Sequence, residues 1–178
     1  LAARCRDINP DITVNVIDDF LTMQTLEDYL DRGYDYVIDA IDSIKFKAAM
    51  INWCKRNKQP IVTTGGAGGM TDPTMIQVAD LWKTYNDPLA AKVRASLKKN
   101  HGITTKPGKT FGVDCVFSSQ QPVYPKADGT VSHEKPGIHG VSLDCRFGYG
   151  AASVVTPVFG FMAASRVINR VLAKHARK

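Results

Sequence analysis

The order of apolar segments between residues 36 and 64 constrains the fold more than any other feature of this sequence. An apolar run of strand length, 36–40, precedes a segment with helical periodicity, 43–57, and a second strand-like run follows at 60–64. Strand, helix and strand joined by short connections predict parallel strands linked by right-handed crossovers. Neither run alternates polar and apolar residues, as expected for strands that are covered on both faces. We therefore predict an α/β fold.

Other segments extend this pattern. The sequence predicts a helix end at 1–8, a strand at 13–18, a helix at 25–30, a strand at 75–81, a basic helix at 88–99, a strand at 113–118, an irregular region at 120–149 and a long helix from about 150 to 174. The predicted architecture is Rossmann-like: a mostly parallel sheet flanked by helices, then a mixed strand and loop region and a long terminal helix. Its 178 residues suit one domain. Within it we distinguish a Rossmann-like half, 1–69, from a part for substrate binding and dimerisation, 70–178.

Composition excludes several classes of protein. No apolar run reaches the length of a membrane-spanning helix, so we expect no membrane span. The four cysteines lie far apart, without a C-x-x-C pair, which favours reduced thiols and a cytoplasmic location over a zinc site or disulfides. A net charge of +6 is compatible with a polyanionic partner without requiring one.

Two carboxylates follow the first predicted strand of the crossover. Asp39 belongs to the strand end and Asp42 to the turn before the helix. Ligands of open α/β sheets gather at the carboxyl ends of the strands, and Mg²⁺ in nucleotide sites takes one or two carboxylates together with phosphate oxygens. Asp42 is therefore a candidate magnesium ligand. The alternative is that Asp42 or Ser43 only caps the helix.

Five segments together carry a family resemblance. They are "INPDITVNVIDDF", "YDYVIDAIDS", "PIVTTGGAGG", "DPLAAKVRASLKK" and "GVDCVFSS", in this order along the chain. The second, with Lys47 and Asn52, resembles the D-x-x-D-[NS] segment of the ubiquitin-activating-enzyme-like adenylating superfamily. Taken together, the five segments are similar to the tRNA threonylcarbamoyladenosine dehydratases.

The resemblance implies an ATP-dependent, ligase-type enzyme that activates the carboxylate of a threonylcarbamoyl group on a tRNA adenosine and closes it to a cyclic hydantoin. It implies ATP and magnesium as cofactors, tRNA as substrate, a homodimer, and a sulfur-transfer protein as a further partner. Asp42 would bind magnesium or the triphosphate and act in catalysis. The nucleotide wall beside it would be formed by Asp39, Ala40, Ile41 and Ser43, and Lys47 would be structural or peripheral.

The glycine-rich turn of this superfamily, with its phosphate-binding arginine and lysine, precedes the segment with which the sequence opens. We therefore expect that the sequence is the C-terminal part of a longer protein and that it binds ATP poorly by itself. The "GGAGG" run at 65–69 follows the wrong strand for a phosphate loop and lacks the Lys-Ser/Thr ending. We interpret it as a flexible loop at the rim of the site.

The remaining candidates are less specific. Cys145, in the irregular region, is a candidate catalytic thiol, whereas Cys115 lies in a predicted strand and is expected to be a core residue. His133 and His139 do not have a metal-ligand spacing and are expected at the surface. Candidate tRNA-binding residues, for which a solvated helix face is the alternative, are Lys92, Arg94, Lys98, Lys99, Lys106 and Lys109.

Two other functions remain open at this stage. The chain could activate a small ubiquitin-like sulfur carrier, although the absence of paired zinc cysteines and the "DPLAAKVR" helix argue against that function. It could also be a non-catalytic Rossmann-like scaffold.

Overall fold

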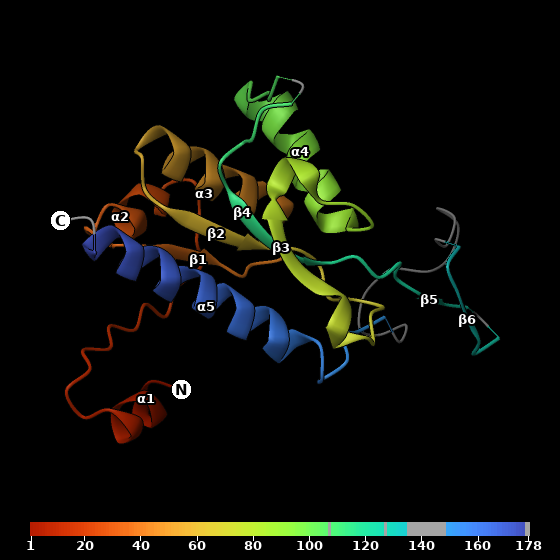
Figure 1. Ribbon diagram of the computed structural model, residues 1–178, viewed down its shortest axis with the longest axis horizontal. Coiled ribbons are helices and arrows are strands. Elements are labelled where there is room, and N and C mark those ends of the chain that lie inside the picture. The colour runs from red at the N-terminus through yellow and green to blue at the C-terminus, as the bar shows by residue number, and fades with distance from the viewer. Residues whose placement is uncertain (107, 127, 135–148, 177–178) are drawn as a thin grey trace.

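The computed structural model describes residues 1–106, 108–126, 128–134 and 149–176 (Figure 1). Its helices are α1 (Ala2–Ile8), α2 (Leu26–Leu30), α3 (Ile44–Arg56), α4 (Pro88–His101) and α5 (Thr156–His175), with short 3-10 helices η1 (Pro73–Met75) and η2 (Leu81–Lys83). Its strands are β1 (Val37–Asp39), β2 (Ile61–Thr64), β3 (Ile76–Asp80), β4 (Asp114–Ser118), β5 (Tyr124–Pro125) and β6 (Val131–Ser132).

The main sheet has the strand order β1-β2-β4-β3. β1, β2 and β4 are parallel, and β3 pairs antiparallel with β4 at the edge. The carboxyl ends of the parallel strands therefore lie at one edge of the sheet, as the crossover pattern predicted. The predicted fold class is confirmed. Within the described residues, no helix is long and apolar enough to cross a membrane.

Helices cover both faces of this sheet. α3 and α4 lie on one face and α5 lies along the other (Figure 1). Successive strand residues alternate between the two cores: Phe117 packs with α3 and α4, whereas its neighbour Val116 packs with the α5 layer, and both are fully buried. This period-2 alternation explains why the strands read as continuous apolar runs in the sequence.

The predicted strand at 13–18 is wrong, because these residues form no regular secondary structure. β-branched residues become a strand only where a neighbour supplies ladder hydrogen bonds and a covered face. No strand of the described part of the chain pairs with this segment, and Val16 is 66% exposed. α1 lies apart from the body, with no buried residue (Figure 1).

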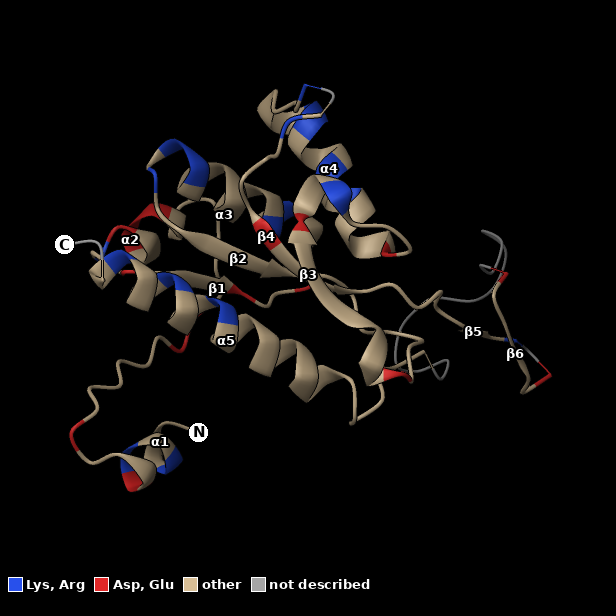
Figure 2. Ribbon diagram, viewed as in Figure 1, with Lys and Arg blue, Asp and Glu red and all other residues tan. Residues whose placement is uncertain are grey.

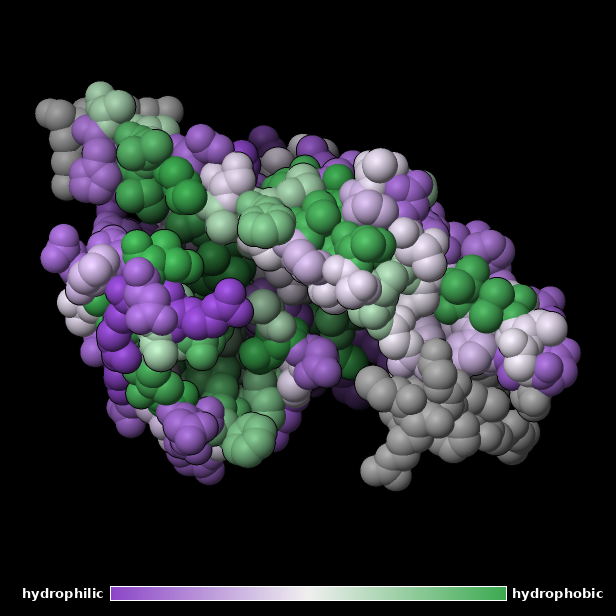
Figure 3. All heavy atoms as spheres, turned by 90° about the horizontal axis from the view of Figure 1, so that it is seen from below, coloured by the Kyte–Doolittle hydropathy of each residue, from purple (hydrophilic) through white to green (hydrophobic). Residues whose placement is uncertain are grey.

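The terminal helix begins later than predicted, at Thr156 rather than near residue 150, with Pro157 in its first turn, where a missing N–H costs no hydrogen bond. Arg166 anchors the helix to the sheet, because its guanidinium binds the Asp114 carboxylate with Nε 2.6 Å from Oδ2. The outward face of α5 keeps apolar side chains exposed, including Phe161 and Leu172. Apolar patches are visible on this side of the molecule (Figure 3).

Candidate active site

A buried ion pair fixes the turn that follows β1. Lys47 Nζ, from α3, donates to Asp39 Oδ2 at 2.8 Å and to Thr63 Oγ1 of β2 at 3.1 Å. The Thr63 hydroxyl donates to the same carboxylate oxygen at 2.6 Å, and the Ile41 backbone N–H donates to the other at 3.2 Å. Lys47, Asp39 and Thr63 are each 1% exposed. The triad therefore ties β1, β2 and α3 together beneath the turn.

This arrangement changes the interpretation of two predicted residues. Helical periodicity alone places Lys47 mostly off the apolar stripe of α3, yet its side chain is buried. Of the two roles expected for Lys47, structural or peripheral, the observed contacts agree with the structural one. The Asp39 carboxylate faces inward, so the geometry gives it a positioning role, and its direct contact with a nucleotide stays a prediction.

Asp42 lies at the exposed surface of the turn, directly before α3. The helix N-cap is Ser43, yet no side chain caps it, and the first turn contains no acidic residue. The alternative that Asp42 or Ser43 serves as the cap is therefore not observed. The first N–H groups of α3 lack a side-chain acceptor at the end of the helix where the macrodipole favours anions. A carboxylate and a helix N-terminus thus share this edge of the sheet, beside Ala40 and Ile41.

A cavity of about 560 Å³ opens beside Asp42. Its walls are the turn after β1, the glycine loop after β2, the start of α4 and two tyrosines from the region after β4. The lining includes Asp42, Gly66, Gly68, Lys92, Tyr124 and Tyr149. The cavity therefore lies at the carboxyl ends of the parallel strands, where open α/β sheets bind ligands.

The glycine loop at 65–69 borders this cavity, but close packing restrains it more than the sequence suggested. A Cβ at Gly65 would lie 1.7 Å from Asp87 Oδ2, and the N–H of Gly66 donates to the same carboxylate at 3.1 Å. Asp87 also accepts from the Ala90 N–H at 2.8 Å and so caps α4. Burial raises the pKa of Asp87, and these N–H donors oppose that shift.

The candidate tRNA-binding residues separate into three groups. Lys92 lines the cavity. Arg94 donates to the carbonyl of Leu81 and to the Thr84 hydroxyl, so its described contacts are internal. The rest lie at the end of α4 and in the loop after it, where Figure 2 shows basic residues, and they are Lys98, Lys99, Lys106 and Lys109. Lys106 and Lys109 line a cavity together with Lys55 and Arg56 of α3.

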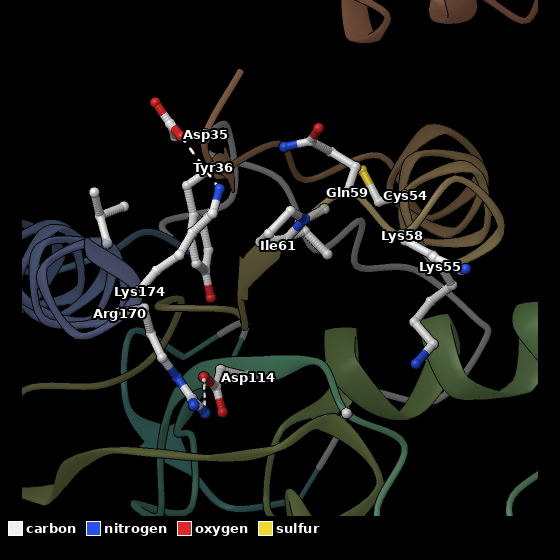
Figure 4. A pocket seen from close by; sticks show the side chains of 13 residues that line it. Asp35, Tyr36, Cys54, Lys55, Lys58, Gln59, Ile61, Asp114, Arg170 and Lys174 are labelled. Carbon is white, nitrogen blue, oxygen red and sulfur yellow. Dashed lines mark hydrogen bonds and ion pairs between the residues drawn. The ribbon is translucent and has the colours of Figure 1, made fainter. Parts of the chain in front are cut away.

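A second cavity, of about 510 Å³, lies at the opposite edge of the sheet, where the parallel strands begin (Figure 4). Four of its charged side chains form ion pairs: Arg170 lies 3.4 Å from Asp114 and Lys174 lies 3.5 Å from Asp35. The carboxyl ends of the parallel strands do not face this second cavity, and neither does the N-terminus of α3 or α4. We therefore place the candidate active site at the cavity beside Asp42.

The structure confirms the sequence prediction that Cys115 is a core residue. Cys115 is fully buried in β4, and burial raises the pKa of its thiol. Burial likewise raises the pKa of Cys54 to about 12. Cys145 and His139 lie outside the described residues. His133 is exposed, and its Nδ1 lies 3.2 Å from the carbonyl oxygen of Pro122.

Sequence reasoning missed two residues that line this site, Tyr124 and Tyr149, and Asp87, which supports it from behind. The dipeptide Asp87-Pro88 is a helix-start signature and could have identified Asp87 as the cap of α4. Tyr124 and Tyr149 gave no local signal, because their segment has no periodicity. Only the folded chain shows that they share a cavity with Asp42.

Comparison with known proteins adds to this geometry. The model of the ThiF family matches residues 1–178, the whole of this chain. The chain belongs to the ThiF family. It is 52% identical over 179 residues to a tRNA threonylcarbamoyladenosine dehydratase of Escherichia coli K12, covering 100% of this chain and 67% of that protein. A protein of the same name from Haemophilus influenzae is 49% identical, with coverages of 98% and 64%.

Solved structures of ThiF-family relatives agree with the fold. An Escherichia coli tRNA N6-threonylcarbamoyladenosine dehydratase in complex with ATP matches with a TM-score of 0.84 at 48% identity, covering 99% of this chain and 64% of that chain. A complex of the E. coli enzyme with AMP gives the same TM-score. This chain thus spans about two thirds of the length of these Escherichia coli and Haemophilus influenzae relatives. The resemblance identified from the sequence is confirmed.

Proposed function

We propose that this protein catalyses the ATP-dependent dehydration of N6-threonylcarbamoyladenosine in tRNA to its cyclic hydantoin form. The observation that carries the proposal is the position of Asp42: an exposed carboxylate beside an uncapped helix N-terminus, on a cavity at the carboxyl ends of the parallel strands. The relatives named as tRNA threonylcarbamoyladenosine dehydratases, one of them solved with ATP, support the choice of reaction.

The chemistry requires activation because a carboxylate is a poor electrophile. An oxygen of the threonylcarbamoyl carboxylate attacks the α-phosphorus of ATP, and pyrophosphate leaves. A ureido nitrogen of the same group then attacks the acyl carbon, the ring closes with loss of the nitrogen-bound proton, and AMP leaves with the former carboxylate oxygen. The oxygen and hydrogens formally lost as water are thus accounted for, and ATP cleavage drives a ligase-type bond formation.

The protein's part in this scheme is to position groups and stabilise charge. The free N–H groups at the start of α3 and the helix macrodipole would stabilise negative phosphate charge near Asp42. The triad of Lys47, Asp39 and Thr63 would hold that turn in place. Because the nucleophile and the acyl group belong to one substituent, ring closure is intramolecular and needs little beyond exclusion of competing water.

Magnesium fits this site if Asp42 is its protein ligand and phosphates and water supply the remaining ligands. The described residues contain no group of three or more His, Cys, Asp or Glu side chains arranged to hold a metal. Mg²⁺ in nucleotide sites is commonly held by one or two carboxylates, phosphates and water, so one exposed carboxylate is an adequate protein contribution. We propose that Asp42 would hold a magnesium ion that neutralises the triphosphate.

Several assignments extend this proposal to partners. We propose tRNA contacts through the basic residues of α4 and the loop after it, and a homodimer in which the exposed apolar face of α5 is covered. The division into a nucleotide-binding half, 1–69, and a substrate and dimerisation part, 70–178, is likewise proposed. A sulfur-transfer protein is a further proposed partner.

The proposal is tested by ATP–pyrophosphate exchange with the natural protein, combined with mass analysis of the tRNA nucleosides. We expect exchange that depends on tRNA carrying threonylcarbamoyladenosine, and a product nucleoside lighter by one water. Exchange that depends instead on the C-terminus of a ubiquitin-like carrier would support the sulfur-carrier function. Absence of exchange with either substrate would leave a non-catalytic scaffold.

A further inference from the structure

Two aromatic side chains form part of the wall of the candidate active-site cavity. Tyr124 and Tyr149 stack with ring centroids 5.6 Å apart and an interplanar angle of 10°. Tyr124 is only 5% exposed, whereas Tyr149 is partly exposed, and both rings line the cavity that Asp42 borders. β5, which carries Tyr124, lies on the side toward which β2 points (Figure 1). The inner ring therefore supports the outer one.

The glycine loop holds this aromatic wall in place. The Tyr149 hydroxyl donates to the carbonyl oxygen of Gly68 at 3.1 Å. On either side, the Gly69 N–H donates to the Gly150 carbonyl and the Val123 N–H donates to the Gly69 carbonyl, each at 2.9 Å. The Tyr149 ring is thus bonded to the same loop that borders the Asp42 side of the cavity.

The absence of a side chain at two positions of this loop is also required. A Cβ at Gly68 would lie 2.7 Å from the Tyr149 ring, so only glycine leaves room for the ring at this position. At Gly69, φ is +70° and a Cβ would lie 2.2 Å from the Val123 carbonyl oxygen. The "GGAGG" run therefore positions an aromatic surface in the cavity.

A cation completes the cavity. Lys92, one turn into α4, lines it together with Asp42 and Tyr149, and its side chain is exposed. A partly exposed ring and an ammonium group around one cavity, beside the Asp42 carboxylate, suit a ligand with a planar base and a carboxylate substituent. Aromatic side chains stack on unstacked bases in single-stranded loops of RNA.

Resting on the proposed function, we propose that this cavity is the subsite for the modified nucleoside: Tyr149 stacks on the adenine base, and Lys92 binds the carboxylate of its threonylcarbamoyl group. Tyr124 acts as a positioning residue, because it touches the ring of Tyr149 and is itself buried. The base and the carboxylate are thereby held together on the cavity that Asp42 borders.

The test uses the natural protein, a non-hydrolysable ATP analogue and anticodon stem-loop RNAs with or without the threonylcarbamoyl group. Tyr149→Phe and Tyr149→Leu both remove the hydroxyl, but only Phe keeps an aromatic face. We expect the Leu variant to bind the modified RNA about 5- to 150-fold more weakly than the Phe variant, the range expected for one base–aromatic stack. Affinity for the ATP analogue should change by less than about twofold in either variant, because neither removes a proposed ATP contact.

The role of Lys92 has a separate readout. Lys92→Met should abolish the preference for modified over unmodified stem-loop, and Lys92→Arg should retain part of it, because the carboxylate is the recognised group. Tyr34→Ala and Lys83→Met, which alter exposed side chains away from this cavity, are the matched controls and should behave like the unmodified protein.

Two results would overturn the inference while leaving the proposed function intact. Equal RNA affinity of the Leu and Phe variants, with normal dehydration by the unmodified protein, would remove Tyr149 from base recognition. If the Tyr149→Leu variant instead lost as much affinity for the ATP analogue as for the RNA, the base of ATP would be the group that stacks on the ring. Failure of the unmodified protein to form the hydantoin would overturn the proposed function itself.

Discussion

Replacing Lys47 with Met tests whether the buried triad of Lys47, Asp39 and Thr63 stabilises the turn after β1, which borders the candidate active site. The change keeps an unbranched apolar stem and removes the charge. The Asp39 carboxylate, 1% exposed, would keep Thr63 and the Ile41 N–H as donors but would lose the cation that lies 2.8 Å away. Removing one partner of a buried pair leaves an uncompensated charge and typically costs about 3–5 kcal/mol, so we expect the free energy of unfolding to fall by that amount.

The assay is urea unfolding and thermal melting followed by circular dichroism. For a chain of 178 residues, the expected loss corresponds to a fall in melting temperature of about 6–20 °C. The double variant Asp39→Asn, Lys47→Met should recover much of the loss, because no isolated charge remains. Lys45→Met, at an exposed position of the same helix, is the control and should stay within about 0.5 kcal/mol. A cost below about 1 kcal/mol for Lys47→Met would refute the reasoning.

Three further predictions address the site and its frame. Asp42→Asn should abolish tRNA-dependent pyrophosphate exchange while the unfolding free energy changes by less than about 0.5 kcal/mol, since the side chain is exposed; unchanged exchange would remove Asp42 from the site. Gly69→Ala should lower the free energy of unfolding in urea more than Gly129→Ala does. Both glycines have positive φ, but only a Cβ at Gly69 would clash with the Val123 carbonyl oxygen. Equal losses in the two variants would argue against the clash. Because burial raises the pKa of Cys54 to about 12, its thiol stays protonated at pH 8, and mapped thiol labelling should leave it unmodified until the protein unfolds.

The edge of the sheet that carries the candidate active site could be predicted from the sequence because local patterns encode it. Two apolar runs flanking a periodic helix required parallel strands, and this placed Asp42 at their carboxyl ends. The choice between a helix cap and a ligand-facing carboxylate could not be made from spacing, because both need the same residue at the same position. The structure shows no side chain capping α3, and the ligand-binding role of Asp42 stays a prediction.

Tertiary structure decided what depends on partners far away in the chain. Lys47 is buried because Asp39 and Thr63, 8 and 16 residues distant, satisfy its charge and protons, and helical periodicity carries no information about them. Residues 13–18 have strand propensity, but no strand of the described residues pairs with them. Tyr124 and Tyr149 meet Asp42 only across a folded cavity. Propensity and period are properties of neighbouring residues, whereas ion pairing, sheet pairing and cavity walls depend on groups that only the folded chain brings together.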